Sequence, residues 1–154
     1  MELREEIQEE ARRWLGTPYR HQHRMRGVAV DCIGVIWGVG EACRALSVDE
    51  ALVRPYLAYS RLPSPTRFLD ALAAFLEPAG DFVMPGDIAC MAWDNDHGLP
   101  QHVGILCEDR GRPTIIHAES QIGRCVEHGF VGEWPGRVHS WWRYPGVAAL
   151  EFPV

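Results

Sequence analysis

Three residues in this sequence have the types and surroundings of a nucleophilic centre. Cys32 stands in "VDCIGVIWGVG", where an acidic residue and a thiol open a long apolar run. His102 opens "HVGILCE", and His117 lies near the end of "PTIIHAE". A thiol nucleophile needs a base beside it and a third polar group that orients the imidazole. The three residues together therefore indicate a nucleophilic Cys–His centre.

An inert buried thiol is the alternative for Cys32, because cysteines among apolar neighbours usually act as small hydrophobic residues. If the helix begins at this residue, its first turn favours the thiolate and its free N–H groups can bind an oxyanion. Position alone favours the inert thiol, because apolar neighbours are common for such cysteines. The histidines on neighbouring segments favour the nucleophile.

Other chemistries have weaker support in the sequence. His21 and His23 lie near Cys32, but no spacing matches a common zinc signature, so we expect no metal. Phosphate-binding glycine loops, GxSxG and HExxH are absent. The formal net charge of −6 argues against nucleic acid as the main partner.

The length and the composition of the chain suit one globular domain. The chain has 154 residues, 47% of them hydrophobic and 23% charged. The five cysteines form no CxxC pair, and their odd number argues against a disulfide framework. The charged start "MELREEIQEEARRWLG" is not a signal peptide, and no run is long enough to span a membrane. We therefore expect synthesis in the cytoplasm with reduced thiols.

Helices are predicted in the first half of the chain. Apolar residues at helical spacing and a favourable charge order predict a helix over 2–15. A second, buried helix begins near Asp31 or Cys32, and its three glycines require close packing. A third follows Ser64-Pro65, where serine would cap the helix.

Short β-prone runs fill the second half. They are separated by turn signals, including Asp109-Arg110-Gly111. Helices followed by strands predict an α+β fold, with N-terminal helices packed on a small antiparallel sheet. Neighbouring strands of that sheet would place His102 and His117 side by side. The runs are 87–93, 102–108, 113–119, 124–130 and 137–144.

With these residues assembled, the chain resembles the NlpC-type endopeptidases of the bacterial cell wall, which are papain-like cysteine peptidases. The matching stretches occur in the family's order between residues 14 and 120: "WLGTPYRHQH", "VDCIGVIWGV", "PGDIACM", "QHVGILCE" and "IIHAES". The forms "GTPYRHQ" and "DCIG" are most similar to a branch found in bacteriophages and gene-transfer particles, where such a protein accompanies the tail tip.

The resemblance implies a role for each matching position. Cys32 would be the nucleophile, His102 the general base and acid, and His117 the orienting third member. Tyr19 would line the site and position substrate or stabilise the oxyanion. Asp31 would help to hold the free amine of the substrate.

Because of two departures from the family, the residues that form the substrate pocket are undetermined. Ile33 stands where many members have a serine that contributes to substrate binding, and residues 20–23 replace a pair of glycines. The exact bond cut is therefore undetermined, as is any gating by Arg20, His21 and His23. Glu119 and Gln121 are alternatives to His117 as the third member.

The implied activity covers one domain over residues 1–154 and needs no cofactor. The reaction is hydrolysis of an amide in the peptidoglycan stem peptide, typically between D-γ-glutamate and a diamino acid. Tail-tip proteins of a phage-like particle are the expected partners, and the particle would deliver the protein to the wall or periplasm. The alternatives are a tail-tip structural protein with little or no activity and a related amidase or acyltransferase.

Overall fold

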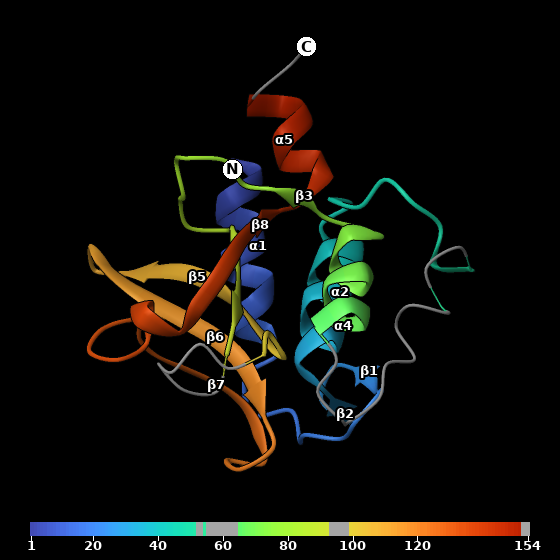
Figure 1. Ribbon diagram of the computed structural model, residues 1–154, viewed down its shortest axis with the longest axis vertical. Helices are drawn as coiled ribbons and strands as arrows, with labels where there is room; N and C mark the ends of the chain where they lie inside the picture. The colour runs from blue at the N-terminus through green and yellow to red at the C-terminus, as the bar shows by residue number, and fades with distance from the viewer. Residues whose placement is uncertain (52–53, 55–64, 93–98, 152–154) are drawn as a thin grey trace.

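A computed structural model describes residues 1–51, 54, 65–92 and 99–151 of the chain. Figure 1 shows helices α2 and α4 on one side, strands β5 to β7 on the other, and α1 running between them at the back. Helix α5 stands at the end of the molecule that carries the C-terminus. The arrangement is α+β, with helices packed on an antiparallel sheet, as the sequence predicts.

Helix α1 spans Leu3–Arg13 and follows from its charge order. Glu2 and Glu5 form a capping box, and arginines occupy the last turn, where they suit the helix dipole. Ile7 and Ala11 are fully buried, so the apolar stripe of the helix faces the core.

Helix α2 spans Cys32–Ala42 and is buried on nearly every side. Its glycines allow the close packing that the sequence requires. A Cβ at Gly38 would lie 2.3 Å from the ring of Trp14, and one at Gly34 would lie 2.3 Å from the carbonyl oxygen of His23. The helix ends at Ala42, and two residues later Arg44 adopts a left-handed φ of 55°.

A six-stranded antiparallel sheet forms the second half of the molecule. Its strand order is β3-β8-β4-β5-β6-β7. The β5–β6 hairpin turns at Arg110 and Gly111, both at positive φ, where the sequence predicts a turn. The strands are β3 (Glu77–Pro78), β4 (Ile88–Met91), β5 (His102–Asp109), β6 (Arg112–Glu119), β7 (Arg124–Gly129) and β8 (Val138–Arg143).

The sheet is buried on both faces. One face packs on α1 and α2 and forms the larger core, to which Val103, Ile105 and Ile116 contribute. The opposite face carries a smaller cluster around Met91 and Ile115. Successive residues of a strand point to opposite faces, so each strand divides its side chains between the two clusters.

Several short elements were not predicted. Residues 19–30 contain the two-stranded ribbon of β1 (Arg24–Met25) and β2 (Ala29–Val30), for which the sequence analysis gives no prediction. Strand β3 and helix α5 (Pro145–Glu151) also lack a sequence prediction, and helix α4 spans only Pro65–Ala73. The predicted cap Ser64 and the end of the strand prediction at Trp93 lie outside the described residues.

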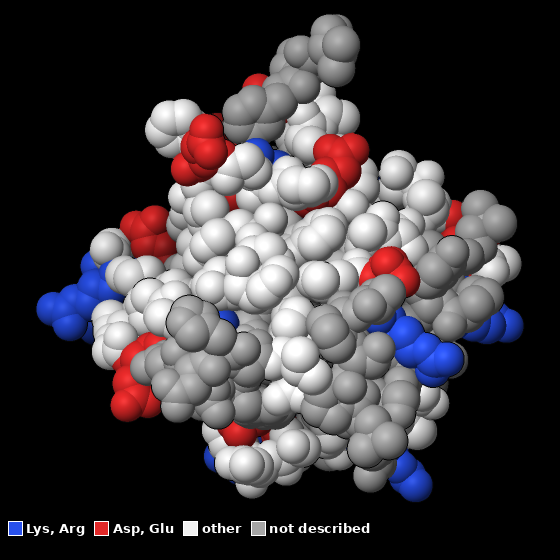
Figure 2. Space-filling view, viewed as in Figure 1, with Lys and Arg blue, Asp and Glu red and all other residues white. Residues whose placement is uncertain are grey.

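On one face of the molecule, the charged side chains lie away from the middle. In the view of Figure 2, arginine and acidic side chains lie mostly at the rim, and the described surface near the middle is largely uncharged. Within the described ranges, no helix has the length and apolar character needed to cross a membrane.

Candidate active site

Cys32 is the first residue of α2, where the sequence predicts a helix start. Its side chain is buried, and Asp31 caps the helix by accepting a 2.7 Å hydrogen bond from the N–H of Gly34. The other carboxylate oxygen of Asp31 accepts a 2.7 Å hydrogen bond from the N–H of Gln22. Asp31 thus ties the preceding loop to the first turn of the helix, and its proposed contact with a substrate amine stays a prediction.

His102 and His117 are brought together by the sheet. The register that pairs Ile105 with Ile116 puts the two histidines diagonally opposite on one face of β5 and β6. Nε2 of His102 lies 2.6 Å from Nδ1 of His117, and both residues are about 98–99% buried. Helix α2, which begins at Cys32, packs against β5, which begins at His102. Their catalytic roles stay predictions.

Burial keeps both imidazoles neutral. It lowers the pKa of His102 well below its usual value, and His117, Arg137 and His128 lower it further by charge repulsion. The pKa of His117 falls to about 3, mainly through burial, with smaller effects from His128 and Arg137. A neutral imidazole can accept a proton, which is what a general base must do.

A third histidine, which the sequence analysis did not select, joins this pair. Nε2 of His128, on β7, lies 2.8 Å from Nε2 of His117. Because Ile115 pairs with His128 in the register, His128 shares a sheet face with His117. Its Nδ1 lies 3.0 Å from the carbonyl oxygen of Gly129. No local signal in the run 124–130 identifies it, because its place beside His117 depends on the register of β6 and β7.

Trp134 and Arg137 cover the outer histidines. The ring of Trp134 lies 5.2 Å from that of His117 and 4.6 Å from that of His128, centre to centre. The guanidinium of Arg137 lies 4.3 Å from the centre of the Trp134 ring. This layer places a permanent positive charge near His117, which opposes the protonation of that ring.

The remaining predicted residues lie in different environments. Tyr19 is partly buried, and its backbone N–H donates a 2.8 Å hydrogen bond to the carbonyl of Gly123. Ile33 is 2% exposed and belongs to the larger core. Glu119 and Gln121 line a hollow of about 310 Å³ together with Ser120, Trp134 and Arg137. The substrate-binding roles of Tyr19 and Ile33 stay predictions.

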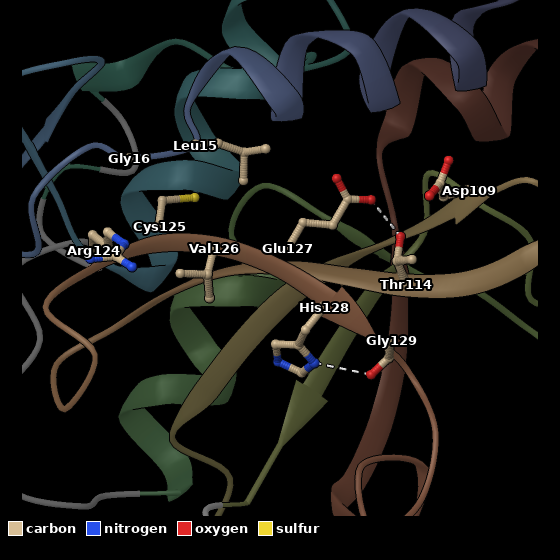
Figure 3. A pocket seen from close by; sticks show the side chains of 10 residues that line it. All are labelled: Leu15, Gly16, Asp109, Thr114, Arg124, Cys125, Val126, Glu127, His128 and Gly129. Carbon is tan, nitrogen blue, oxygen red and sulfur yellow. Dashed lines mark hydrogen bonds between the residues drawn. The ribbon is translucent and has the colours of Figure 1, made fainter.

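A second and larger hollow runs along β7 at the edge of the sheet. It has a volume of about 570 Å³, and His128, Glu127 and Thr114 are among the residues that line it. Figure 3 shows the side chains of Glu127 and His128 leaving opposite sides of β7. The carboxylate of Glu127 accepts a 2.7 Å hydrogen bond from the hydroxyl of Thr114.

The other four cysteines have the properties of structural thiols. All five cysteines are free. Burial raises the pKa of Cys43 to about 11 and the pKa values of Cys90, Cys107 and Cys125 to about 12. Among the described residues, no group of three or more histidine, cysteine or acidic side chains is arranged to hold a metal ion.

Comparison with known proteins identifies the fold. No protein-family model and no curated protein matches the chain, whereas several solved structures do. One is a protein from Staphylococcus aureus described as similar to a lipoprotein of the NLP/P60 family. Its TM-score is 0.58 at 17% identity, and the match covers 92% of this chain and 41% of that one. Another is NlpC1 from Trichomonas vaginalis, with a TM-score of 0.58, 21% identity, and coverage of 92% and 44%.

The fold is that of the NlpC/P60 proteins. This chain spans less than half the length of the two structures just described. An N-acetylmuramoyl-L-alanine amidase from Bacteroides uniformis is also similar, with a TM-score of 0.60 at 13% identity, and the match covers 92% of this chain and 98% of the amidase. In the NlpC/P60 fold of this chain, the helix that begins at Cys32 packs against the strand that begins at His102.

Proposed function

We propose that this chain is a cysteine-type hydrolase that cleaves an amide bond of peptidoglycan. The observation that carries the proposal is the buried 2.6 Å hydrogen bond between His102 and His117, on strands that pack against the helix begun by Cys32. The NlpC/P60 fold and the sequence motifs support the choice of substrate.

In the proposed reaction, His102 takes the proton of the Cys32 thiol, and the thiolate attacks the amide carbonyl carbon. The oxyanion is stabilised by N–H groups at the start of α2, with help from Tyr19. Protonated His102 then gives its proton to the leaving amine, and water hydrolyses the thioester. His117 accepts or donates the hydrogen bond that holds the His102 ring in place.

Purified peptidoglycan provides the test. We expect the wild-type protein, in the presence of a reductant, to release new amine ends that are absent after digestion with Cys32→Ala. Cys43→Ala is the matched control, because Cys43 is a half-buried thiol further along the same segment, and this variant should retain activity. If the wild type releases no amine ends, the hydrolase proposal is wrong and a structural role in a particle gains support.

The bond cleaved has two candidates. The motif resemblance favours the bond between D-γ-glutamate and a diamino acid in the stem peptide. The Bacteroides uniformis amidase, which matches over nearly its full length, favours an amidase cut between muramic acid and L-alanine. Mass spectrometry of the fragments separates the two, because the first leaves an amine on the diamino acid and the second leaves it on alanine.

Delivery by a phage-like tail is a further part of the proposal. It rests on the "GTPYRHQ" and "DCIG" forms, which are similar to the branch that accompanies tail tips. Co-purification of this chain with tail-tip proteins of intact particles would support it. Particles that lack the chain but contain the remaining tail proteins would contradict it.

A further inference from the structure

Three histidine rings form a continuous hydrogen-bonded row across the sheet. His102 on β5, His117 on β6 and His128 on β7 face the same side, with contacts of 2.6 Å and 2.8 Å between ring nitrogens. This row of histidines runs from the start of β5 to the edge strand β7. There His128 lines the larger hollow (Figure 3).

At the outer end of this row of histidines, the donor and the acceptor of the hydrogen bond are fixed. Nδ1 of His128 lies 3.0 Å from the carbonyl oxygen of Gly129. A carbonyl oxygen can only accept a hydrogen bond, so Nδ1 of His128 carries the proton. In a neutral ring, Nε2 of His128 is then the acceptor nitrogen.

Each hydrogen bond then fixes the position of the proton on the next ring. Because Nε2 of His128 accepts, Nε2 of His117 must carry a proton and donate it. Nδ1 of a neutral His117 is then an acceptor, so Nε2 of His102 must donate to it. The proton of His102 is thereby assigned to Nε2, and its Nδ1 becomes the basic nitrogen.

The surroundings keep His102 and His117 in the neutral forms that these hydrogen bonds require. His102 and His117 are almost fully buried, and burial lowers the pKa of each. Arg137, stacked on Trp134, opposes the addition of positive charge. Trp134 packs against both His117 and His128 and holds the two rings in contact.

We infer that His128 is a positioning residue that, with the carbonyl of Gly129, sets the tautomers of His117 and His102 and makes Nδ1 of His102 the base. A histidine as third member has two tautomers, and only the one protonated at Nε2 can accept from His102. His128 supplies the acceptor that selects this tautomer. The kinetic consequence rests on the proposed function, whereas the assignment of protons does not.

Nitrogen-15 NMR of the histidine rings tests the assignment directly. In the wild type at neutral pH, we expect protons on Nε2 of His102, Nε2 of His117 and Nδ1 of His128. In His128→Phe the acceptor is lost while a ring remains beside Trp134, so His117 and His102 should both move their protons to Nδ1. His128→Gln restores an acceptor oxygen near the position of Nε2 and should return the wild-type pattern.

The inference is overturned if the wild type carries the proton of His117 on Nδ1. It is also overturned if His128→Phe leaves both tautomers unchanged, or if His128→Gln behaves like the phenylalanine variant. His128→Phe could fail to fold, which near-ultraviolet circular dichroism would show. In that case the wild-type and His128→Gln spectra still decide whether His128 sets the tautomers. His139→Phe, which changes an exposed histidine on β8, is the matched control and should leave the pattern unchanged.

Kinetics on peptidoglycan fragments add a second readout. We expect kcat of His128→Phe to fall about 10- to 100-fold with little change in KM, as for other residues that orient a reactive group through hydrogen bonds. His128→Gln should recover most of this loss. If the wild type is inactive, the proposed function fails while the NMR result still decides the role of His128. An active wild type with unchanged kcat in His128→Phe would contradict the kinetic consequence.

Discussion

The sheet face on which a histidine lies decides which other histidines it contacts. His102 and His117 were identified from the sequence because each belongs to a short β-prone run beside the other. His128 was not selected, because its run gives no sign of which residues face the buried side. Only the observed register of β6 and β7 shows that it meets His117.

Stability should fall on acidification because the buried histidines resist protonation. An unfolded histidine has a pKa of about 6.5, whereas His117 in the folded protein has a pKa of about 3. Below pH 6.5 the unfolded chain therefore binds a proton that the folded chain does not. We expect each such histidine to lower the free energy of unfolding by about 1.2 kcal/mol between pH 6 and pH 5.

Urea unfolding at several pH values between 7 and 5 measures this slope. His117→Asn should flatten it by the contribution of one histidine. An equal slope in wild type and His117→Asn would show that His117 is not held neutral by the fold.

Secondary-structure elements were predictable where periodicity or charge order was strong. Helices α1 and α2 and strands β4 to β8 correspond to predicted segments, and the start of α2 at Cys32 agrees with the prediction. The two-residue strands β1, β2 and β3 are too short to carry a periodic signal, and their pairing is decided by tertiary contacts. Helix α5 has only Pro145 at its start as a local signal.

Gly38 in the middle of α2 should not tolerate alanine, although alanine is the better helix former. A Cβ at this position would approach the Trp14 ring to 2.3 Å, and Trp14 is itself buried. We expect Gly38→Ala to lower the free energy of unfolding by about 1–3 kcal/mol, the usual effect of overpacking.

Chemical denaturation measures this loss, and a second substitution tests its cause. A Trp14→Phe background shortens the ring that the new methyl group meets, so Gly38→Ala should cost less there than in the wild type. If the cost is the same in both backgrounds, contact with Trp14 is not its origin.

At the scale of the whole molecule, a buried ion network joins the ends of the chain to the sheet. Asp87, just before β4, is fully buried, and its carboxylate binds Arg143 of β8 at 2.8 Å and Arg4 of α1 at 3.1 Å. Arg4 also binds Glu151 in α5 at 2.5 Å. The α+β organisation was predictable from the order of helices and strands, but the partners of Asp87 lie too far away in sequence to be predicted.

Asp87→Ala should therefore destabilise the entire fold. Its removal leaves two arginines buried without their shared carboxylate, for which we expect a loss of about 3–5 kcal/mol in the free energy of unfolding. Arg13→Ala, which removes an exposed partner of Glu10, should change that free energy by less than about 1 kcal/mol. Thermal or urea unfolding of both variants measures the contrast, and comparable losses would show that the buried network adds nothing beyond a surface pair.

The pairing of the Gly16–Tyr19 segment with β7 bears on how copies of this chain behave at high concentration. The N–H groups of Gly16 and Tyr19 donate to the carbonyls of Cys125 and Gly123, and the N–H of Cys125 donates to Thr17. An outer strand with unused backbone groups offers a template on which another molecule can extend the sheet. Here the chain's own segment occupies the beginning of that template, which disfavours intermolecular strand addition at this end and, with it, aggregation through β7.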